Sequence, residues 1–146
     1  MQDNDIISFQ SIGYGVIFED LLASPPEGIK SLGALLHKTR NNWDKFINQW
    51  KPNDLPLKAL YDTTNRLGVG AEVYTFLHED AAPAIESWLA RKGITSPVTY
   101  YESPQLLEYD LRFKRAVRTI FVPHKDQAEI LGIRATVTPS TSAWVL

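Results

Sequence analysis

Cysteine is absent from the 146 residues of this chain. Its absence excludes disulfide bonds, thiolate zinc sites and a cysteine nucleophile, and nothing else indicates an oxidising compartment, so we expect a cytoplasmic protein. No apolar run approaches the roughly 20 residues that a membrane-spanning helix requires, so we expect no membrane contact. The opening stretch MQDNDIISF also lacks the basic region and the long apolar core of a secretory signal.

The chain also lacks a strong charge of either sign. Its 15 basic and 17 acidic side chains give a formal net charge of -2, which provides no general attraction to nucleic acid or to an anionic membrane. Nucleic-acid binding would therefore depend on a local patch such as the basic group Arg112, Lys114, Arg115 and Arg118. Such a group is more typical of a solvated helix face, so nucleic acid is the least favoured partner.

Apolar runs alternate with helical patterns along the chain, and this alternation is typical of a layered α/β domain. The run AEVYTFL at 71–77 is nearly continuously apolar, as expected for a strand covered on both faces of a sheet. The helix expected after it has Pro83 in its first turn and ends at Gly93. We predict one domain over residues 1–146, a doubly wound, mostly parallel, Rossmann-like sheet of about five strands with helices on both faces.

A helical insertion or cap-like region is predicted around residues 27–67. Within it, apolar side chains recur at positions i, i+3, i+4 and i+7 and so share one helix face, namely Trp43, Phe46, Ile47 and Trp50. We expect this aromatic stripe to pack in the core or over the sheet, and a partner-binding surface is the alternative. A further helix is expected from Pro56 to a stop at Gly68.

Ligands of doubly wound sheets bind beyond the carboxyl ends of the strands. Three predicted strands end in residues that bear on chemistry. The first, expected at residues 15–19, ends in Glu19 and is followed by Asp20; Thr75 lies near the end of the second; and Pro123 and His124 follow the strand TIFV. These strand ends are the candidate site.

With these elements in this order, the chain resembles the haloacid dehalogenase-like (HAD-like) phosphatase superfamily, most clearly from about Leu67 onwards. The resemblance implies a HAD-like fold and four site positions: Asp-x-Asp after the first strand, a hydroxyl after the second, a lysine further on and an acidic pair after the fourth. Thr75 in VYTF matches the hydroxyl, and Lys114 in LRFKRAV matches the lysine.

The first of the four positions departs from the family pattern. If Asp20 is aligned with the nucleophile, Leu22 replaces the second acid. If Glu19 is aligned there instead, Leu21 replaces it. Neither alignment restores the acidic pair.

The fourth position departs as well, because Pro123 and His124 stand where the family has two acids. The nearest acid, Asp126, falls within the turn of helix expected next. Mg²⁺ requires near-octahedral oxygen ligation, usually from carboxylates together with substrate phosphate. We therefore expect neither a bound metal nor another cofactor.

Two functions follow from these residues. The first is a catalytically impaired HAD-like protein that acts as a binding or regulatory module, with another protein as the expected partner and a phosphate-containing molecule as a second possible ligand. The rival is a Mg²⁺-dependent phosphohydrolase of a small phosphate ester or nucleotide. In the rival, Asp20 is the nucleophile, Thr75 and Lys114 hold the phosphate, and His124 takes part in proton transfer. In the first, these four are remnants of a catalytic site.

Overall fold

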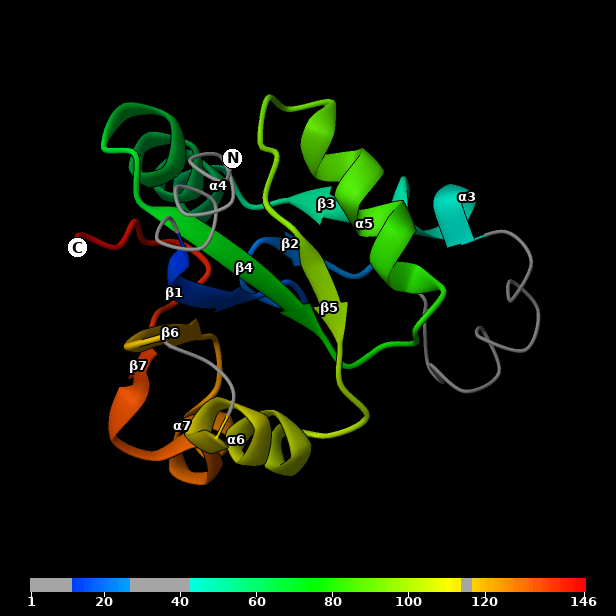
Figure 1. Ribbon diagram of the computed structural model, residues 1–146. Helices are drawn as coiled ribbons and strands as arrows, with labels where there is room; N and C mark the ends of the chain where they lie inside the picture. The colour runs from blue at the N-terminus through cyan, green and yellow to red at the C-terminus, as the bar shows by residue number, and fades with distance from the viewer. Residues whose placement is uncertain (1–11, 27–42, 114–116) are drawn as a thin grey trace, which may run out of the picture.

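A parallel sheet of five strands forms the centre of the molecule (Figure 1). The computed structural model describes residues 12–26, 43–113 and 117–146. The strand order is β5-β4-β1-β6-β7, and all four pairings are parallel. The strands are β1 (Ile12–Ile17), β4 (Gly70–Thr75), β5 (Val98–Tyr100), β6 (Thr119–Val122) and β7 (Ala135–Val137). The predicted α/β class and doubly wound parallel sheet are confirmed.

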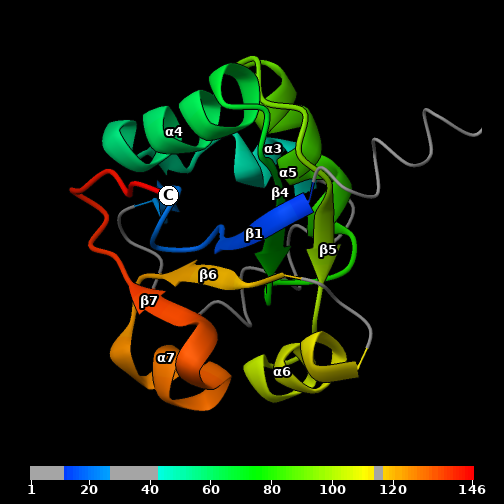
Figure 2. The ribbon, with the colours of Figure 1, turned by 60° about the vertical axis from the view of Figure 1, so that its left-hand side comes forward.

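Helices cover both faces of this sheet. They are α3 (Trp43–Ile47), α4 (Asp54–Tyr61), α5 (Ala81–Ala90), α6 (Pro104–Phe113) and α7 (Lys125–Leu131). Figure 2 shows α3, α4 and α5 on one face and α6 and α7 on the other. A π-helical turn continues α4 over Asp62–Arg66, and a 3-10 turn at Gly132–Arg134 precedes β7. No helix in the described part of the chain is long and apolar enough to cross a membrane.

A short antiparallel pair lies outside the main sheet, formed by β2 (Ala23–Ser24) and β3 (Lys51–Pro52). Of the predicted insertion at 27–67, the stretch from 43 onwards forms α3, β3, α4 and the π-helical turn, and 27–42 lies outside the described residues. Whether this region acts as a cap stays a prediction.

The sheet is buried on both sides because successive side chains of each strand point to opposite faces. On β1, Tyr14 and Val16 belong to the core cluster beneath α3, α4 and α5, whereas Ile17 belongs to the cluster beneath α6 and α7. On β6, Phe121 joins the first cluster and Ile120 the second. Two separate cores therefore hold β1 and its neighbours in place.

The aromatic stripe belongs to the first core. Trp43, Phe46, Ile47 and Trp50 are 5%, 1%, 0% and 4% exposed, and the ring centroids of Phe18 and Trp50 lie 5.3 Å apart. The expectation of core packing is confirmed. The alternative, a partner-binding surface, is wrong for these side chains because they pack within the core and do not form an exposed surface.

Gly15 allows a close approach inside the sheet. A Cβ built on Gly15 would lie 2.4 Å from Cε2 of Tyr74, well inside the distance of 3.5–4.0 Å or so at which two carbon atoms pack. The Tyr74 side chain is fully buried, so it could move aside only by displacing its packed neighbours. The absence of a side chain at Gly15 is thus a packing requirement of the β1–β4 pair.

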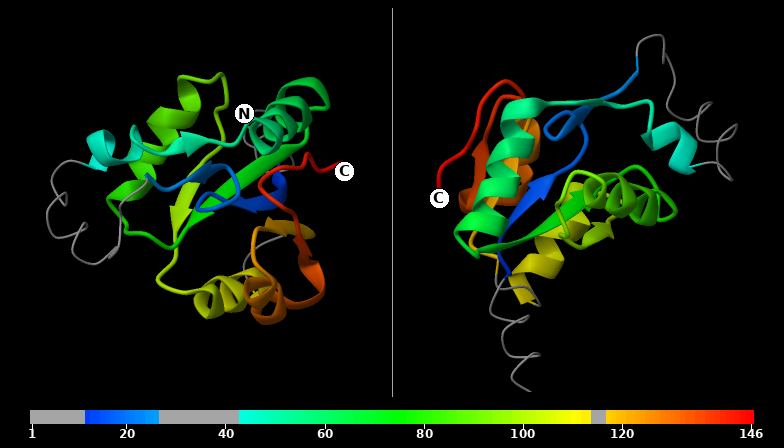
Figure 3. Two further views of the ribbon diagram at one scale, coloured as in Figure 1. Left: turned by 180° about the vertical axis from the view of Figure 1, so that it is seen from behind. Right: turned by 90° about the horizontal axis from the view of Figure 1, so that it is seen from above.

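The strand order reverses at β1. The connections from β1 to β4 and from β4 to β5 carry the helices of one face, and those that lead to β6 and β7 carry α6 and α7 on the other (Figures 1 and 3). In open α/β sheets, ligands bind at the carboxyl edge where the strand order reverses. In this chain that place lies beyond the ends of β1 and β6.

Candidate functional site

The chain makes a tight turn directly after β1. The Leu22 N–H donates to the Phe18 carbonyl at 3.0 Å, and the Asp20 N–H donates to the Ala23 carbonyl at 2.8 Å. Asp20 has a φ of 67° and is the only non-glycine residue with a positive φ in the described part of the chain; Asp is one of the residues that tolerate this conformation. The first strand therefore ends at Ile17, earlier than predicted, and the two acids that follow belong to the turn.

Asp20 and His124 meet at this edge of the sheet. The distance from Asp20 Oδ2 to His124 Nε2 is 2.8 Å, although the residues are 104 positions apart in the sequence. They meet because Asp20 follows β1, His124 follows β6 and these strands are neighbours. The side chains are 42% and 51% exposed, so water screens the pair, and such exposed pairs contribute about 1 kcal/mol or less.

Glu19 is the most perturbed acid of the site. Its Oε2 accepts a hydrogen bond from the Phe76 N–H at 3.0 Å, whereas its Oε1 is buried without a hydrogen-bond partner. Burial raises the pKa of Glu19 to about 7, and hydrogen bonds from the Thr75 hydroxyl and the Phe76 amide offset part of that rise. Near neutral pH, this carboxyl group is therefore about half protonated.

Thr75 lies at the end of β4, as the sequence predicted, but it is fully buried. Its Oγ1 accepts a hydrogen bond from the Leu77 N–H at 3.2 Å. The Thr75 hydroxyl also forms a hydrogen bond with Glu19, which limits the rise of the Glu19 pKa. Thr75 is not among the residues that line the crevice described below, and a contact between its hydroxyl and a ligand phosphate stays a prediction.

Lys114, the remaining predicted site residue, lies outside the described residues, as does Arg115. Within the basic group, Arg112 is exposed and donates from Nε to Glu108 Oε2 at 3.0 Å. This ion pair within one helix raises the pKa of Arg112 further. For Arg112 the structure shows the solvated helix face that such groups usually form.

A crevice of about 510 Å³ opens beside these residues. Glu19 and Asp20 lie on its wall together with Asp126 and Gln127 of α7. The remaining lining residues are apolar: Pro25, Trp50, Phe76, Leu77, Pro104 and Ile130. Mostly apolar walls with a few polar groups are the usual composition of a small-molecule site.

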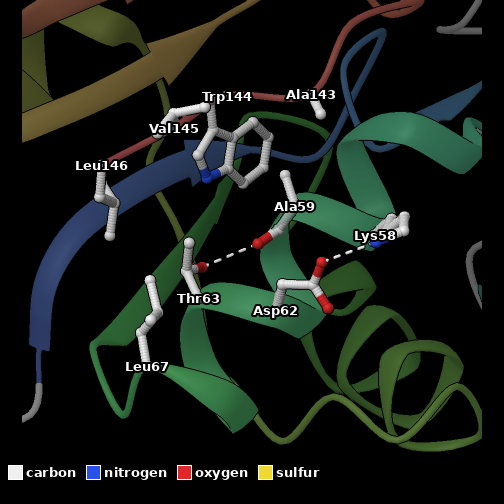
Figure 4. A pocket seen from close by; sticks show the side chains of 9 residues that line it. All are labelled: Lys58, Ala59, Asp62, Thr63, Leu67, Ala143, Trp144, Val145 and Leu146. Carbon is white, nitrogen blue, oxygen red and sulfur yellow. Dashed lines mark hydrogen bonds and ion pairs between the residues drawn. The ribbon is translucent and has the colours of Figure 1, made fainter.

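A second cavity of about 290 Å³ lies between α4, the π-helical turn and residues 143–146 (Figure 4). Lys58 and Asp62 form an ion pair of 2.8 Å on its wall, and the Thr63 hydroxyl donates to the Ala59 carbonyl at 2.9 Å. Trp144 is 7% exposed. Because the charged groups of this cavity already pair with each other, the crevice beside Glu19 is the better candidate site.

The carboxylates of the crevice do not form a recognisable metal centre. Within residues 12–26, 43–113 and 117–146, no three His, Cys, Asp or Glu side chains converge in a way that could hold a metal ion. Asp20 already contacts His124, and Glu19 Oε2 already accepts the Phe76 amide.

The importance of Glu19 could be seen only in part from the sequence. Its place at the end of an apolar run marked it for inspection, and one alignment put it at the nucleophile position. The burial of one carboxylate oxygen depends on how the turn folds back over β4, and no local pattern reports that.

Comparison with known proteins assigns no family to the chain: no family model, no curated protein and no solved structure matches it.

Proposed function

We propose that this protein is a binding or regulatory module on a HAD-like scaffold, with its ligand in the crevice beside Glu19 and without metal-dependent phosphoryl transfer. The state of the two acids after β1 carries the proposal. Asp20 is paired with His124, and Glu19 holds a proton to near neutral pH because it is buried.

Neither acid offers Mg²⁺ the oxygen atoms that it requires. Mg²⁺ binds charged oxygen atoms in near-octahedral geometry and gives up its water reluctantly. A metal at Asp20 would compete with the His124 contact, and a metal at Glu19 would have to displace a proton and the Phe76 amide. The third acid, Asp126, lies on a different element, α7.

The same crevice is poorly suited to phosphoryl transfer. The transferred group carries charge on its equatorial oxygens, which phosphoryl-transfer enzymes neutralise with Lys, Arg or metal ions. No lysine or arginine is among the described residues that line the crevice, whereas Glu19, Asp20 and Asp126 are. Loss of one such stabilising donor typically lowers kcat by about 10²- to 10³-fold.

Exposed apolar side chains support another protein as the partner. On α6, Leu107 and Leu111 are buried, while Leu106, Tyr109 and Phe113 are 49%, 59% and 64% exposed. The centroids of the Tyr109 and Phe113 rings lie 5.0 Å apart. Exposed apolar groups that cluster in this way are typical of interaction surfaces.

Hydrolysis of p-nitrophenyl phosphate with and without Mg²⁺, together with calorimetric titration of Mg²⁺, tests the proposal. The wild type, Asp20→Asn and Glu19→Gln are compared with Asp44→Asn, an equal change of charge at an exposed residue of α3. We expect no Mg²⁺-dependent turnover and no saturable Mg²⁺ binding in any of them. Turnover that Asp20→Asn abolishes and Asp44→Asn retains would establish the phosphohydrolase instead.

A further inference from the structure

We propose that the crevice binds an organic ammonium ion on an apolar body that also carries a hydrogen-bond acceptor, and that it discriminates against phosphate. The inference rests on the proposed function, since it assigns a ligand class to the same crevice. Three independent features of the walls support it: their charge, their unpaired polar atoms and their apolar surface.

The charge of the described walls has one sign. Asp20 and Asp126 line the crevice together with Glu19, which is about half ionised near neutral pH, and no described lysine, arginine or histidine lines it. A phosphate dianion in this place would meet like charges, whereas an ammonium ion would meet opposite ones. Within a partly desolvated crevice both effects are stronger than in water.

The walls also contain polar atoms without partners. Glu19 Oε1 and Gln127 Oε1 are both buried and lack a hydrogen-bond partner. Each ionised carboxylate or amide oxygen accepts N–H donors, and an ammonium group offers three donors and no acceptor. Both oxygens belong to residues of the crevice wall but have almost no exposed surface. A buried polar atom without a partner is costly, so an ammonium group that reaches them through a small movement of the wall gains affinity from both.

Trp50 adds a requirement for an acceptor. The residue is 4% exposed, it lines the crevice, and its Nε1 is buried without a partner. Indole nitrogen donates only, so its partner on the ligand must be an oxygen or a similar acceptor. The neighbouring apolar walls, among them Phe76 and Ile130, take the body that joins the two polar groups.

Three small probes that share one apolar ring test the inference. Phenylalaninamide has an ammonium group and a carbonyl acceptor, N-acetylphenylalaninamide keeps the ring and the carbonyl groups without the charge, and phenyl phosphate is an anion. Binding is measured by calorimetry and by tryptophan fluorescence. We expect phenylalaninamide to bind at least about tenfold more tightly than its acetylated form, since each tenfold change corresponds to about 1.4 kcal/mol, and phenyl phosphate to bind most weakly.

Variants connect binding to the named walls. Glu19→Gln and Asp126→Asn should each weaken the binding of phenylalaninamide, and Asp44→Asn on the exposed surface of α3 should not change it. Both free amines and lysine side chains carry an ammonium group. Nα-acetyl-lysinamide distinguishes these two sources of ligand, because its only ammonium group is on a lysine side chain. Tighter binding of that probe than of phenylalaninamide assigns the site to a peptide lysine, and weaker binding assigns it to a small amine.

Several outcomes contradict the inference. A preference for phenyl phosphate overturns it. So does a failure of all the amines to bind, or an unchanged affinity in both Glu19→Gln and Asp126→Asn. Each differs from the result that overturns the proposed function, which is Mg²⁺-dependent turnover that requires Asp20. A module without turnover that prefers phosphate would keep the proposed function and refute only the ligand class.

Discussion

Replacement of Glu19 with Gln should stabilise the protein at neutral and alkaline pH, because it removes a buried group that resists ionisation. Folding raises the pKa of Glu19 from 4.5 to about 7. Below both values the group is protonated in the folded and the unfolded protein, so its proton favours neither state. Between them the unfolded chain releases the proton first, and the folded state therefore loses stability as the pH rises.

The size of this loss follows from the distance between the two pKa values. At about 1.4 kcal/mol for each pH unit between 4.5 and 7, the full loss is about 3 kcal/mol and is complete above pH 7. Gln has the shape of the protonated acid, and its oxygen can still accept the Phe76 N–H. The free energy of unfolding of Glu19→Gln should exceed that of the wild type by about 1 kcal/mol or less at pH 5 and by about 3 kcal/mol at pH 8.

Urea unfolding of both proteins between pH 5 and pH 8 measures this difference. The charged and titratable groups near Glu19, namely Asp20, His124 and Asp126, are present in both proteins, so their direct titration cancels to first order. Asp44→Asn on the exposed surface of α3 serves as the control and should give a difference that does not change with pH. A pH-independent difference for Glu19→Gln, or a variant that is less stable than the wild type at pH 8, would refute the reasoning.

Three other substitutions test the packing and the site. Gly15→Ala should lower the free energy of unfolding by about 1 to 3 kcal/mol because its Cβ would meet the buried Tyr74 ring; an unchanged urea midpoint would contradict this. His124→Gln should cost about 1 kcal/mol or less because the pair with Asp20 is exposed, and a larger loss of urea stability would show that the contact is structural. Thr63→Val removes the buried hydroxyl that contacts Tyr14 OH and should cost about 1 to 3 kcal/mol, which thermal unfolding checks; a stable variant would mean that the tyrosine finds another partner.

The sheet could be predicted from the sequence because its signals are local. Most of the apolar run at 71–77 forms the buried strand β4, which ends at Thr75, and the helix expected before Gly93 is α5. Once the strands are recognised, right-handed crossovers restrict their order to few arrangements. The carboxyl edge beyond β1, β4 and β6 could therefore be chosen as the candidate site from the sequence alone.

The helix expected from Pro56 to Gly68 shows what local sequence signals cannot predict. Regular α4 ends at Tyr61 and widens into a π-helical turn. In this turn the Thr63 and Thr64 hydroxyls donate to the carbonyls of Ala59 and Leu60 at 2.9 and 2.8 Å. Apolar periodicity cannot report this competition between side chains and the backbone for the same acceptors.

The site was harder to predict than the sheet because it depends on contacts between distant residues. Nothing near Asp20 in the sequence indicates that His124 is its partner, and nothing near Glu19 indicates that one oxygen is buried without a hydrogen bond. Both facts arise when the turn after β1 folds against the ends of β4 and β6.

The contact between Asp20 and His124 also gives the molecule a built-in reporter. It joins a residue of the turn after β1 to one that the chain reaches 104 positions later, after α3, α4, α5 and α6 and directly before α7. The imidazole NMR resonances of His124 should therefore report whether the turn after β1 is packed against the end of β6. A ligand that moves Asp20 away from His124 should change the chemical shifts of that imidazole ring.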